Sequence, residues 1–486
     1  MKKRIMNFFL FFSVFFIGFL ICTSSLYVLT TKALVEEKNI NNKINSLDRS
    51  SWIWNTTEVV STESTADSRN PALYIDSADN IHVAWQDWSD YASSGTDMDV
   101  FYKRWNASTS SWTTTEVISA ESTDESQSVS IFVDSTDTVH VVWDDYTDML
   151  GAGTDRDIFY KQWNSSTSSW TSPELVSTES TGSSRHASLA VDFEGNIHVV
   201  WRDYTDYNGA GTDEDIFYKF WNASSYSWNT TEVVSTGSID DSGTTSLAVD
   251  SAGTVHIVWN DYDYNTDDDW DIVYRNLTTS NLWSPIFVVS NESTGIAVEA
   301  SITVDLTDSI YIAWRDNTDY ASSGFDYDIF FKYWNSSTTL WSLYDVVSLE
   351  STGDSWLPSI AVDPANTIHI VWHDYTNYTN CGLDHDIFYK RKDISYSWTI
   401  TEVVSTESTG DSRHPSFGVD SNGLVHVVWF DFTDYLSSGT DVDIFYKYLG
   451  PAPIIHEFDN TVIISSLIAG TFILLIVVIQ YRRKKF

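Results

Sequence analysis

Apolar residues follow two patterns along the chain, with uninterrupted runs at both ends and short alternating segments between them. The C-terminal run, 462–480, contains no charged residue and precedes the basic cluster Arg482–Lys485. As a helix rising ~1.5 Å per residue, Val462–Ile479 would extend about 27 Å, enough to cross a hydrocarbon core. The run therefore predicts a transmembrane helix over 462–480, and the basic cluster predicts a cytoplasmic tail over 481–486.

The N-terminal run has the features of a targeting segment. Lys2, Lys3 and Arg4 precede apolar residues that continue to about Leu29. This order predicts a signal peptide or an uncleaved signal anchor over 1–33. A linker, 34–50, and a stalk, 451–461, then flank a middle region that both ends place outside the cell. The predicted location is thus a cell membrane crossed once near the C-terminus.

The middle region, 51–450, repeats one unit seven times. The string His-Val-Val-Trp-x-Asp recurs with its tryptophan at regular intervals of 55 to 58 residues. These tryptophans are Trp85, Trp143, Trp201, Trp259, Trp314, Trp372 and Trp429. Such a period indicates a repeat architecture in which each unit packs only on its neighbours.

Each unit contains four short apolar segments separated by turn residues. Examples are Ser246–Val249, Val255–Trp259, Asp215–Lys219 and Glu232–Ser235, and no helical periodicity occurs between them. Four-stranded antiparallel units at a fixed period predict an all-β fold, a seven-bladed β-propeller. The last repeat lacks its fourth strand, whereas Ser51–Val60 matches one. The N-terminal segment is therefore expected to complete the last blade and to close the ring.

Net charge limits the partners of this region. The chain has 68 acidic and 27 basic residues, for a formal net charge of −41. Such a surface repels phosphate backbones, so nucleic-acid binding is not expected. Two cysteines, Cys22 and Cys381, cannot form a disulfide framework.

Two stretches of the repeat resemble the sialidase-like propellers with Asp-box (BNR) repeats. They are Asp99–Ser119, which includes the hairpin Asn106–Trp112, and Leu189–Asp206. The hairpin keeps the tryptophan of the Asp box and lacks its Asp and Gly. The resemblance implies the propeller fold over 51–450. Sialidases have six blades and this chain has seven repeats, so the resemblance does not carry their activity over.

Acidic loops recur between the second and third strands of each repeat. Every such loop ends in Asp-x-Asp, and another Asp follows two residues after the repeated tryptophan. Carboxylates on flexible loops suit Ca²⁺, which takes six to eight oxygen ligands. Asp side chains also stabilise turns by accepting backbone N–H bonds, and this alternative stays open. The candidate Ca²⁺ ligands are Asp97, Asp99, Asp155, Asp157, Asp213, Asp215, Asp441 and Asp443.

A candidate ligand site lies at the start of the first strand, which is innermost in a propeller. Arg69, Arg185 and Arg413 occupy this position in three repeats, and Trp356 occupies it in another. Guanidinium forks bind carboxylates in two-point contacts, as the arginine cluster of sialidases does, and an indole ring stacks on ligand rings. The alternative is that each arginine pairs with a neighbouring Asp. The recurring histidines of the second strand are expected to be structural.

Glycosylation signals recur between the third and fourth strands. The candidate acceptors are Asn106, Asn164, Asn222, Asn276 and Asn335, each in an N-x-[ST] motif. Asn and Ser are also common turn formers, so the recurrence has a structural alternative.

Three functions fit these features. The favoured one is a membrane-anchored cell-surface module that binds a glycan or a protein on the face bearing the acidic loops. The alternatives are a structural glycoprotein of the surface coat and a sialidase-like extracellular glycosidase. No catalytic residue can be assigned from the sequence, and no cofactor other than Ca²⁺ is expected.

Overall fold

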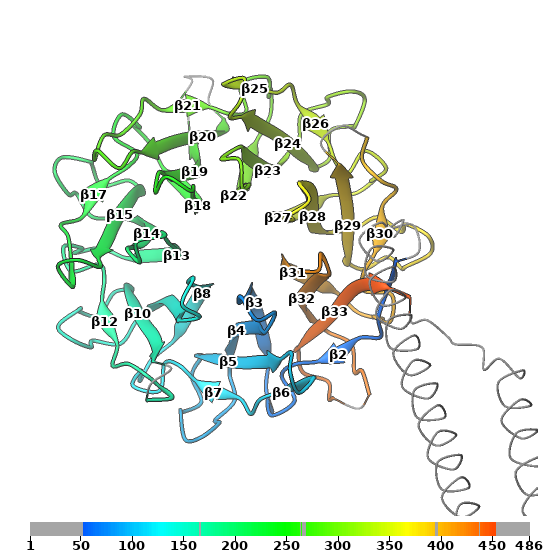
Figure 1. Ribbon diagram of the computed structural model, residues 1–486, viewed down its shortest axis with the longest axis horizontal. Helices are drawn as coiled ribbons and strands as arrows, with labels where there is room; N and C mark the ends of the chain where they lie inside the picture. The colour runs from blue at the N-terminus through cyan, green and yellow to red at the C-terminus, as the bar shows by residue number, and fades with distance from the viewer. Residues whose placement is uncertain are drawn as a thin grey trace, which may run out of the picture. The chain divides into compact units, whose positions relative to one another are not determined.

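The computed structural model describes residues 52–452, except 165–166, 263, 265–268, 394–396 and 437. Seven antiparallel sheets of four or five strands surround a central opening (Figure 1). The predicted seven-bladed β-propeller is thus confirmed. The predicted signal segment and transmembrane helix lie outside the described residues. Within the described part, no helix is long and apolar enough to span a membrane.

The strands of each blade follow one another outward from the axis. The innermost strands are β3 (Ser68–Ile75), β8 (Ser126–Val133), β13 (Ser184–Val191), β18 (Ser242–Val249), β22 (Ala297–Val304), β27 (Ser355–Val362) and β31 (Ser412–Val419). The second strands are β4 (Ile81–Asp87), β9 (Val139–Asp145), β14 (Ile197–Asp203), β19 (Val255–Tyr262), β23 (Ile310–Asp316), β28 (Thr367–Asp374) and β32 (Val425–Asp431). The third strands are β5 (Asp99–Asn106), β10 (Asp157–Asn164), β15 (Asp215–Asn222), β20 (Trp270–Leu277), β24 (Asp328–Asn335), β29 (Asp386–Asp393) and β33 (Asp443–Pro451). We number the blades 1 to 7 in this order.

The outermost strand is short and, in most blades, broken into two pieces. These pieces are β6 (Ser111–Trp112), β7 (Glu116–Val117), β11 (Ser169–Trp170), β12 (Glu174–Leu175), β16 (Ser227–Trp228), β17 (Glu232–Val233), β21 (Phe287–Val288), β25 (Leu340–Trp341), β26 (Asp345–Val346) and β30 (Glu402–Val403). In blade 7 the outer pieces are β1 (Trp52–Trp54) and β2 (Glu58–Val59). Each outer edge therefore offers only a few residues in extended pairing.

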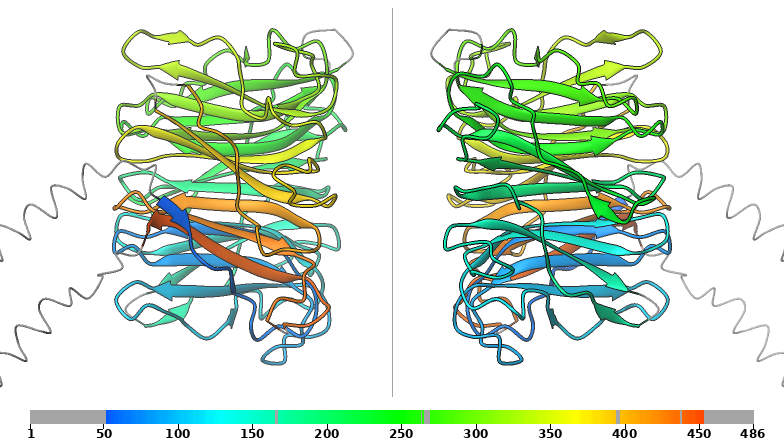
Figure 2. Two further views of the ribbon diagram at one scale, coloured as in Figure 1. Left: turned by 90° about the vertical axis from the view of Figure 1, so that its right-hand side faces the viewer. Right: turned by 90° about the vertical axis from the view of Figure 1, so that its left-hand side faces the viewer.

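The hydrophobic core lies between neighbouring blades. Trp201 of β14 is fully buried and packs in one cluster with Val142 and Tyr160 of blade 2. The six equivalent tryptophans are buried in the same way. Burying a large apolar side chain contributes about 1.5–3 kcal/mol, so the repeated tryptophan joins adjacent blades. Figure 2 shows the propeller edge-on, with its strands running between the two faces.

The N-terminal segment closes the ring, as the sequence predicts. β1 and β2 pair with β33 in an antiparallel register in which Val59 lies opposite Phe445. The Val60 amide donates to the Ile444 carbonyl at 2.7 Å, and Val60 itself is fully buried. The first described residues thus form the outer edge of the last blade.

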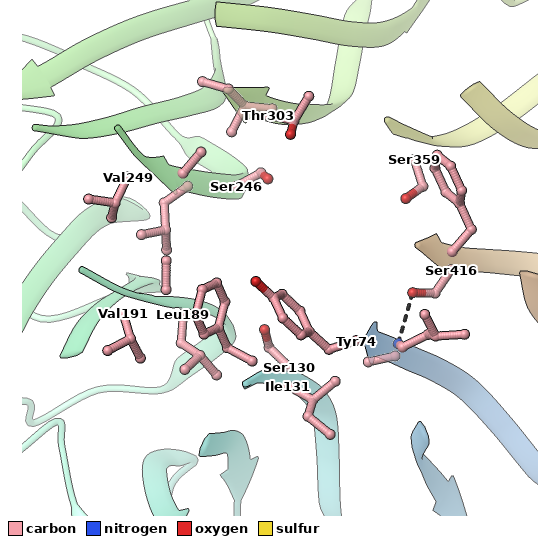
Figure 3. Close-up of a pocket in the computed structure, with 18 of the residues that line it drawn as sticks. Tyr74, Ser130, Ile131, Leu189, Val191, Ser246, Val249, Thr303, Ser359 and Ser416 are labelled. Atoms are coloured by element: carbon pink, nitrogen blue, oxygen red, sulfur yellow. Dashed lines mark hydrogen bonds between the residues drawn. The ribbon is translucent and has the colours of Figure 1, made fainter. Parts of the chain in front are cut away.

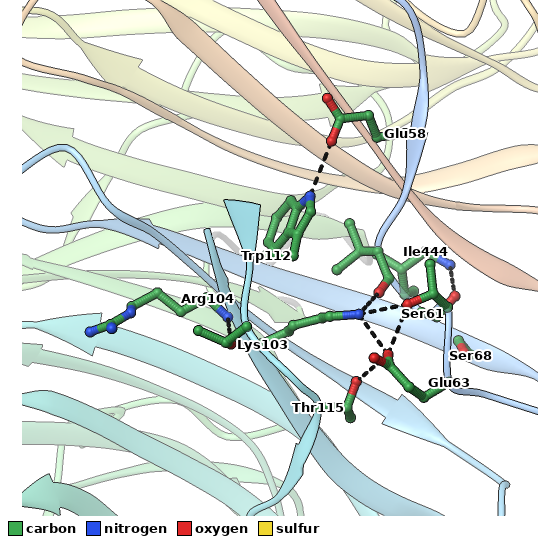
Figure 4. A network of polar contacts seen from close by, with 12 residues as sticks. Glu58, Ser61, Glu63, Ser68, Lys103, Arg104, Trp112, Thr115 and Ile444 are labelled. Carbon is green, nitrogen blue, oxygen red and sulfur yellow. Dashed lines mark hydrogen bonds and ion pairs between the residues drawn. The ribbon is translucent and has the colours of Figure 1, made fainter. Parts of the chain in front are cut away.

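A cation, which is buried in six blades and half-buried in blade 4, links every blade to the one before it. Lys103 donates to the Val60 carbonyl at 3.0 Å, to Thr62 at 2.7 Å and to Glu63 at 2.6 Å (Figure 4). The seven cations are Lys103, Lys161, Lys219, Arg275, Lys332, Lys390 and Lys447. We call these contacts the blade latches. The Lys103 latch joins blade 1 to the N-terminal segment that completes blade 7, so the same contact also links the first blade to the last.

The recurring histidines are structural, as expected. His198 shares a hydrogen bond of 2.7 Å with the Tyr218 hydroxyl and another of 3.3 Å with Asp192. In blade 5 the residue in this position is Tyr311, and its hydroxyl donates directly to Asp305 at 2.8 Å. The exception therefore preserves the contact with the aspartate.

The antiparallel blades give the propeller two distinct faces. The loop face carries the connections such as 88–98 and 118–125, and the hairpin face carries those such as 76–80 and 107–110. β33 runs from Asp443 at the loop face towards Leu449 at the hairpin face. The Asn55 amide donates to the Tyr448 carbonyl at 3.0 Å, near the end of β33. The polypeptide therefore joins and leaves the propeller at the hairpin face.

Candidate functional site

Three positions on the loop face differ strongly from blade to blade. We call them the variable positions: the second residue of the inner strand, the residue before the last Asp of the second strand, and the residue before the third strand. Arg69, Gln86 and Met98 occupy them in blade 1, whereas Trp356, His373 and His385 occupy them in blade 6. The intervening core positions repeat almost unchanged. The loop face is thus where the repeats lose their symmetry.

Arginine gathers at these positions. Six of the nine arginines between residues 52 and 452 lie there. They are Arg69, Arg156, Arg185, Arg202, Arg315 and Arg413. The described lysines lie instead on third strands, where six of them form blade latches. The centre of this face is therefore rich in guanidinium groups in an otherwise acidic protein.

Two of the predicted ligand arginines are braced by aspartates. Arg69 pairs with Asp67 at 2.7 Å, and Arg413 pairs with Asp411 at 2.7 Å. Each aspartate also accepts a backbone N–H from the neighbouring blade, for example that of His385 on Asp411. These two arginines therefore pair with a neighbouring aspartate, as the alternative to a ligand site predicted.

Arg185 differs because serine replaces the aspartate two residues before it. Ser183 stands where Asp67 and Asp411 stand in blades 1 and 7. In the described residues, no hydrogen bond or ion pair reaches the Arg185 guanidinium, whose carbon lies 5.6 Å from the centre of the Tyr204 ring. Its Nε is buried without a partner. Arg185 is thus able to accept an anionic ligand without first breaking an ion pair.

Trp356 lies at the loop face but is covered by neighbouring side chains. The Arg315 guanidinium lies 3.8 Å from the centre of its ring, and His373 stacks on it at 6.4 Å. A ligand ring would have to displace Arg315 to reach the face that this guanidinium covers. Stacking of Trp356 on a ligand stays a prediction.

Glu299 is an acidic residue in the inner strand of blade 5, one residue after the position that Arg69 occupies in blade 1. Val298, which pairs with Arg315, is the equivalent of Arg69, and Glu299 follows it with a φ of 60° in a bulge. Its carboxylate lies 2.9 Å from Arg315 and accepts the Leu357 N–H at 3.1 Å. Glu299 therefore joins blades 5 and 6 and positions Arg315.

A tyrosine–glutamate pair lies beside Arg185. Glu214 lies near the Tyr204 hydroxyl, and its carboxylate lies 3.3 Å from Arg202. Tyr204 is 40% exposed, so a ligand can reach it. Burial and Glu214 raise the pKa of Tyr204, so the hydroxyl keeps its proton at rest. Arg185, Arg202, Tyr204 and Glu214 form one contiguous polar patch on blade 3.

In blades 6 and 7, three histidine side chains pack together on the loop face instead. His373 stacks on His414 at 5.8 Å and meets His385 edge-on at 5.3 Å. Burial lowers the pKa of His373 well below its ordinary value and that of His414 to about 4. Both rings are therefore neutral at physiological pH and add aromatic surface rather than charge.

The central channel contains a cavity of about 460 Å³ (Figure 3). Inner-strand serines line it, among them Ser130, Ser246 and Ser359. Tyr74 points into it and packs on Phe132, with their ring centres 4.4 Å apart. The equivalent positions in blades 3 and 4 are alanine, so the two aromatic rings narrow the channel from one side.

The acidic loops contain two kinds of aspartate. The Asp after the repeated tryptophan braces the loop: both oxygens of Asp203 accept hydrogen bonds, from Ser180, Ser184, Trp201 and the Thr205 amide. Asx-type bracing, the alternative to a metal, thus accounts for this residue.

In six of the seven Asp-x-Asp motifs, one carboxylate oxygen of the second Asp has no hydrogen-bond partner. Asp157 accepts the Ser177 hydroxyl at 2.6 Å through one oxygen, and its other oxygen is buried without a partner. The same holds for Asp99, Asp215, Asp328, Asp386 and Asp443. Burial, with repulsion from Asp155, raises the pKa of Asp157 to about 7. No group of three or more His, Cys, Asp or Glu side chains in the described residues is arranged to hold a metal, so Ca²⁺ stays a prediction.

Four of the predicted glycosylation sites lie at the end of a third strand. Asn106 is one of them, and its side-chain oxygen accepts the Ser108 and Thr109 amides at 3.0 and 3.2 Å, which makes an Asx turn. The others are Asn164, Asn222 and Asn335. Asn276 lies two residues earlier, within β20 opposite His256, and donates to the Tyr274 hydroxyl at 3.1 Å. Asn276 is therefore part of the sheet, unlike the other four.

Comparison with known proteins supports the fold alone. No family model matches the chain, and no curated protein sequence matches it. A copper-bound fungal alcohol oxidase is 12% identical, with a TM-score of 0.51 over 84% of this chain and 78% of its own. The polysaccharide lyase Uly1 is 10% identical, with 0.49 over 79% and 90%. A mutant NanB sialidase of Streptococcus pneumoniae is 11% identical, with 0.41 over 80% and 69%.

The likeness to the alcohol oxidase, with a TM-score of 0.51 at 12% identity, shows a shared fold and nothing finer. The chain is also similar in fold to the sialidase and the polysaccharide lyase. These likenesses assign no ligand and no reaction to this chain.

Proposed function

We propose that the chain is a membrane-anchored cell-surface protein whose loop face binds a carboxylate-bearing ligand, carried by an acidic glycan or a protein. The observation that carries this proposal is Arg185, an unpaired guanidinium among positions where the repeats diverge. A guanidinium fork matches a carboxylate in two parallel hydrogen bonds.

The path of the chain supports display of this face. Trp54 and Leu449 lie at the hairpin face, so a tether continuing from either end starts opposite the arginines. The chain therefore enters and leaves the propeller on the face opposite to Arg185. A ligand on another cell or in the surroundings can then reach Arg185.

The decisive experiment removes or occupies the free guanidinium. We expect Arg185→Ala to weaken binding of the full-length chain to carboxylated glycans on an array at least tenfold. Ser183→Asp should act similarly, because it recreates the aspartate that pairs with Arg69 and Arg413 in blades 1 and 7. It does so without removing any part of the arginine.

The control is Arg69→Ala, which removes an arginine already held by Asp67 and should reduce binding less. A protein ligand would appear instead as Arg185-dependent binding to proteins and no binding to glycans. Undiminished binding by both Arg185→Ala and Ser183→Asp would contradict the proposal.

A second candidate function, glycoside hydrolysis, rests on the Tyr204–Glu214 pair. In this reaction Glu214 would take the Tyr204 hydroxyl proton as the phenolic oxygen bonds to the anomeric carbon of the substrate. The bond from that carbon to the aglycone oxygen would break, and the departing aglycone would take a proton from water. We then expect slow turnover of a fluorogenic acidic glycoside that Tyr204→Phe abolishes while binding persists. Absence of turnover by the wild-type protein would leave binding as the function.

A further inference from the structure

A second cavity, of about 370 Å³, lies between blades 1 and 2 towards the hairpin face. Blade 1 contributes Arg104 and Glu116, and blade 2 contributes Asp137 and Trp163. It is separate from the variable positions, since none of them lines it. We call this cavity the blade 1–2 groove.

The equivalent grooves of three other blades are filled by an aromatic ring. Phe220 takes the place of Arg104 in blade 3 and stacks at 6.0 Å on His198. Tyr333 and Tyr448 do the same in blades 5 and 7, at 5.9 Å from Tyr311 and 6.0 Å from His426. Arginine at this position leaves the groove open in blade 1.

Part of the groove wall has no capacity for further hydrogen bonds. Asp76 accepts donors from Asn80, the Ala78 amide and His82, and His82 also contacts the Tyr102 hydroxyl. These groups form a fixed wall of the kind found in every blade.

The remaining polar groups are free to meet a ligand. In the described residues, no hydrogen bond or ion pair reaches the Arg104 guanidinium, and Figure 4 shows it extending away from the Lys103 latch. One oxygen of Glu116 accepts the Trp170 indole N–H at 3.0 Å, and one oxygen of Asp137 accepts the Ser77 amide at 3.2 Å. Each carboxylate keeps its other oxygen for a further donor. Burial raises the pKa of Glu116, so a donated hydrogen bond would favour its ionised form.

We propose that the blade 1–2 groove is a ligand site for a neutral saccharide unit. Sugar hydroxyls donate to Glu116 and Asp137 and accept from Arg104, while the apolar face of the ring lies on Trp163. Three carboxylates, those of Asp76, Glu116 and Asp137, face a single guanidinium, so an anion is repelled where the loop face would attract one. A hexose has hydroxyl groups that both donate and accept, so it suits a groove that offers carboxylate acceptors and one guanidinium donor. The volume of the groove accommodates one or two such units.

The test uses the full-length chain in a detergent without a sugar head group. We expect saturation-transfer NMR and calorimetry to detect at least one of the neutral methyl glycosides of glucose, galactose and mannose, and methyl glucuronide to bind more weakly. Arg104→Phe, which copies Phe220, should fill the groove and weaken this binding at least tenfold. Because phenylalanine is native at the equivalent position, the variant is expected to unfold at the wild-type temperature.

Three controls separate the possible outcomes. Gln162→Phe makes the same change in blade 2, between blades 2 and 3, and should leave binding unchanged. Arg185→Ala should also leave it unchanged, so the two ligand sites can succeed or fail independently. Arg104→Gln, which copies Gln162, replaces Arg104→Phe if that variant does not fold. Undiminished binding by the folded Arg104 variant, or no binding of any neutral glycoside by the wild type, overturns the proposal.

Discussion

The stability of Asp157→Asn relative to the wild type is expected to rise by about 2–4 kcal/mol between pH 4 and pH 8. Burial raises the pKa of Asp157 from 3.8 to about 7, and each pKa unit corresponds to about 1.4 kcal/mol. The folded protein keeps this proton between about pH 4 and 7, whereas the unfolded chain has lost it. The wild type therefore loses stability as the pH rises through this interval, and asparagine, which does not titrate, removes the loss.

Chemical denaturation at intervals between pH 4 and 8 measures this difference. Asp203→Asn is the matched control: the oxygens of Asp203 accept four donors, so an amide NH₂ should destabilise the protein across the whole range. A pH-independent difference for Asp157→Asn would contradict the expected result.

The same measurement tests the calcium prediction. Bound Ca²⁺ between Asp155 and Asp157 would raise the unfolding midpoint of the wild type at pH 8 and not that of Asp157→Asn. If chelator and added Ca²⁺ leave the wild-type midpoint unchanged, the acidic loops serve only to brace their turns.

Lys103→Met is expected to destabilise the protein by about 2–4 kcal/mol and to loosen the closing segment. The substitution leaves the Val60 carbonyl without its donor in a buried position and removes the contact with Glu63. Among the latched segments that the structure describes, Trp52–Val60 alone belongs to a blade whose other strands lie near the opposite end of the chain. Ser61, which follows this segment, accepts the Ile444 amide from 383 residues away. Limited proteolysis should therefore cut the variant after this segment at protease levels that spare the wild type.

Lys219→Met provides the matched control. Lys219 makes the same contacts with Val176, Thr178 and Glu179, within a continuous stretch of chain. It should cost similar stability in denaturation while leaving the N-terminal segment resistant. Equal resistance of the N-terminus in both variants would show that closure does not depend on the latch.

The architecture was predictable because the same buried positions recur in every repeat of 55 to 58 residues. The buried tryptophan of each second strand recurs in all seven repeats, and the missing last strand reappears at Ser51–Val60. The split of the outer strands was not predicted, since turn residues such as Thr113 and Thr115 lie inside a segment that reads as continuous. The bulge in which Glu299 lies was not predicted either; it recurs in the inner strand of all seven blades, because each inner strand carries one extra residue opposite the second strand.

The site was predictable only in part. Arg69, Arg185 and Arg413 were found because they recur, and Ser183 already distinguished Arg185 in the sequence. Arg202 and Glu214 were not predicted, because each precedes an aspartate that recurs in every repeat and was itself interpreted as the functional residue. An alignment of the seven repeats would have found them, because they lie at positions where the repeats differ. Side-chain contacts such as that between Tyr204 and Glu214 depend on loop geometry that the repeat does not encode.

The broken outer strands affect how copies of this protein behave when crowded. A continuous exposed strand is a template on which a neighbouring molecule can add its own strand, and aggregation begins there. Here pieces such as Ser111–Trp112 and Glu116–Val117 end before a second molecule could form more than a few bonds. Many copies can therefore stand side by side at high density without their perimeters fusing into a common sheet.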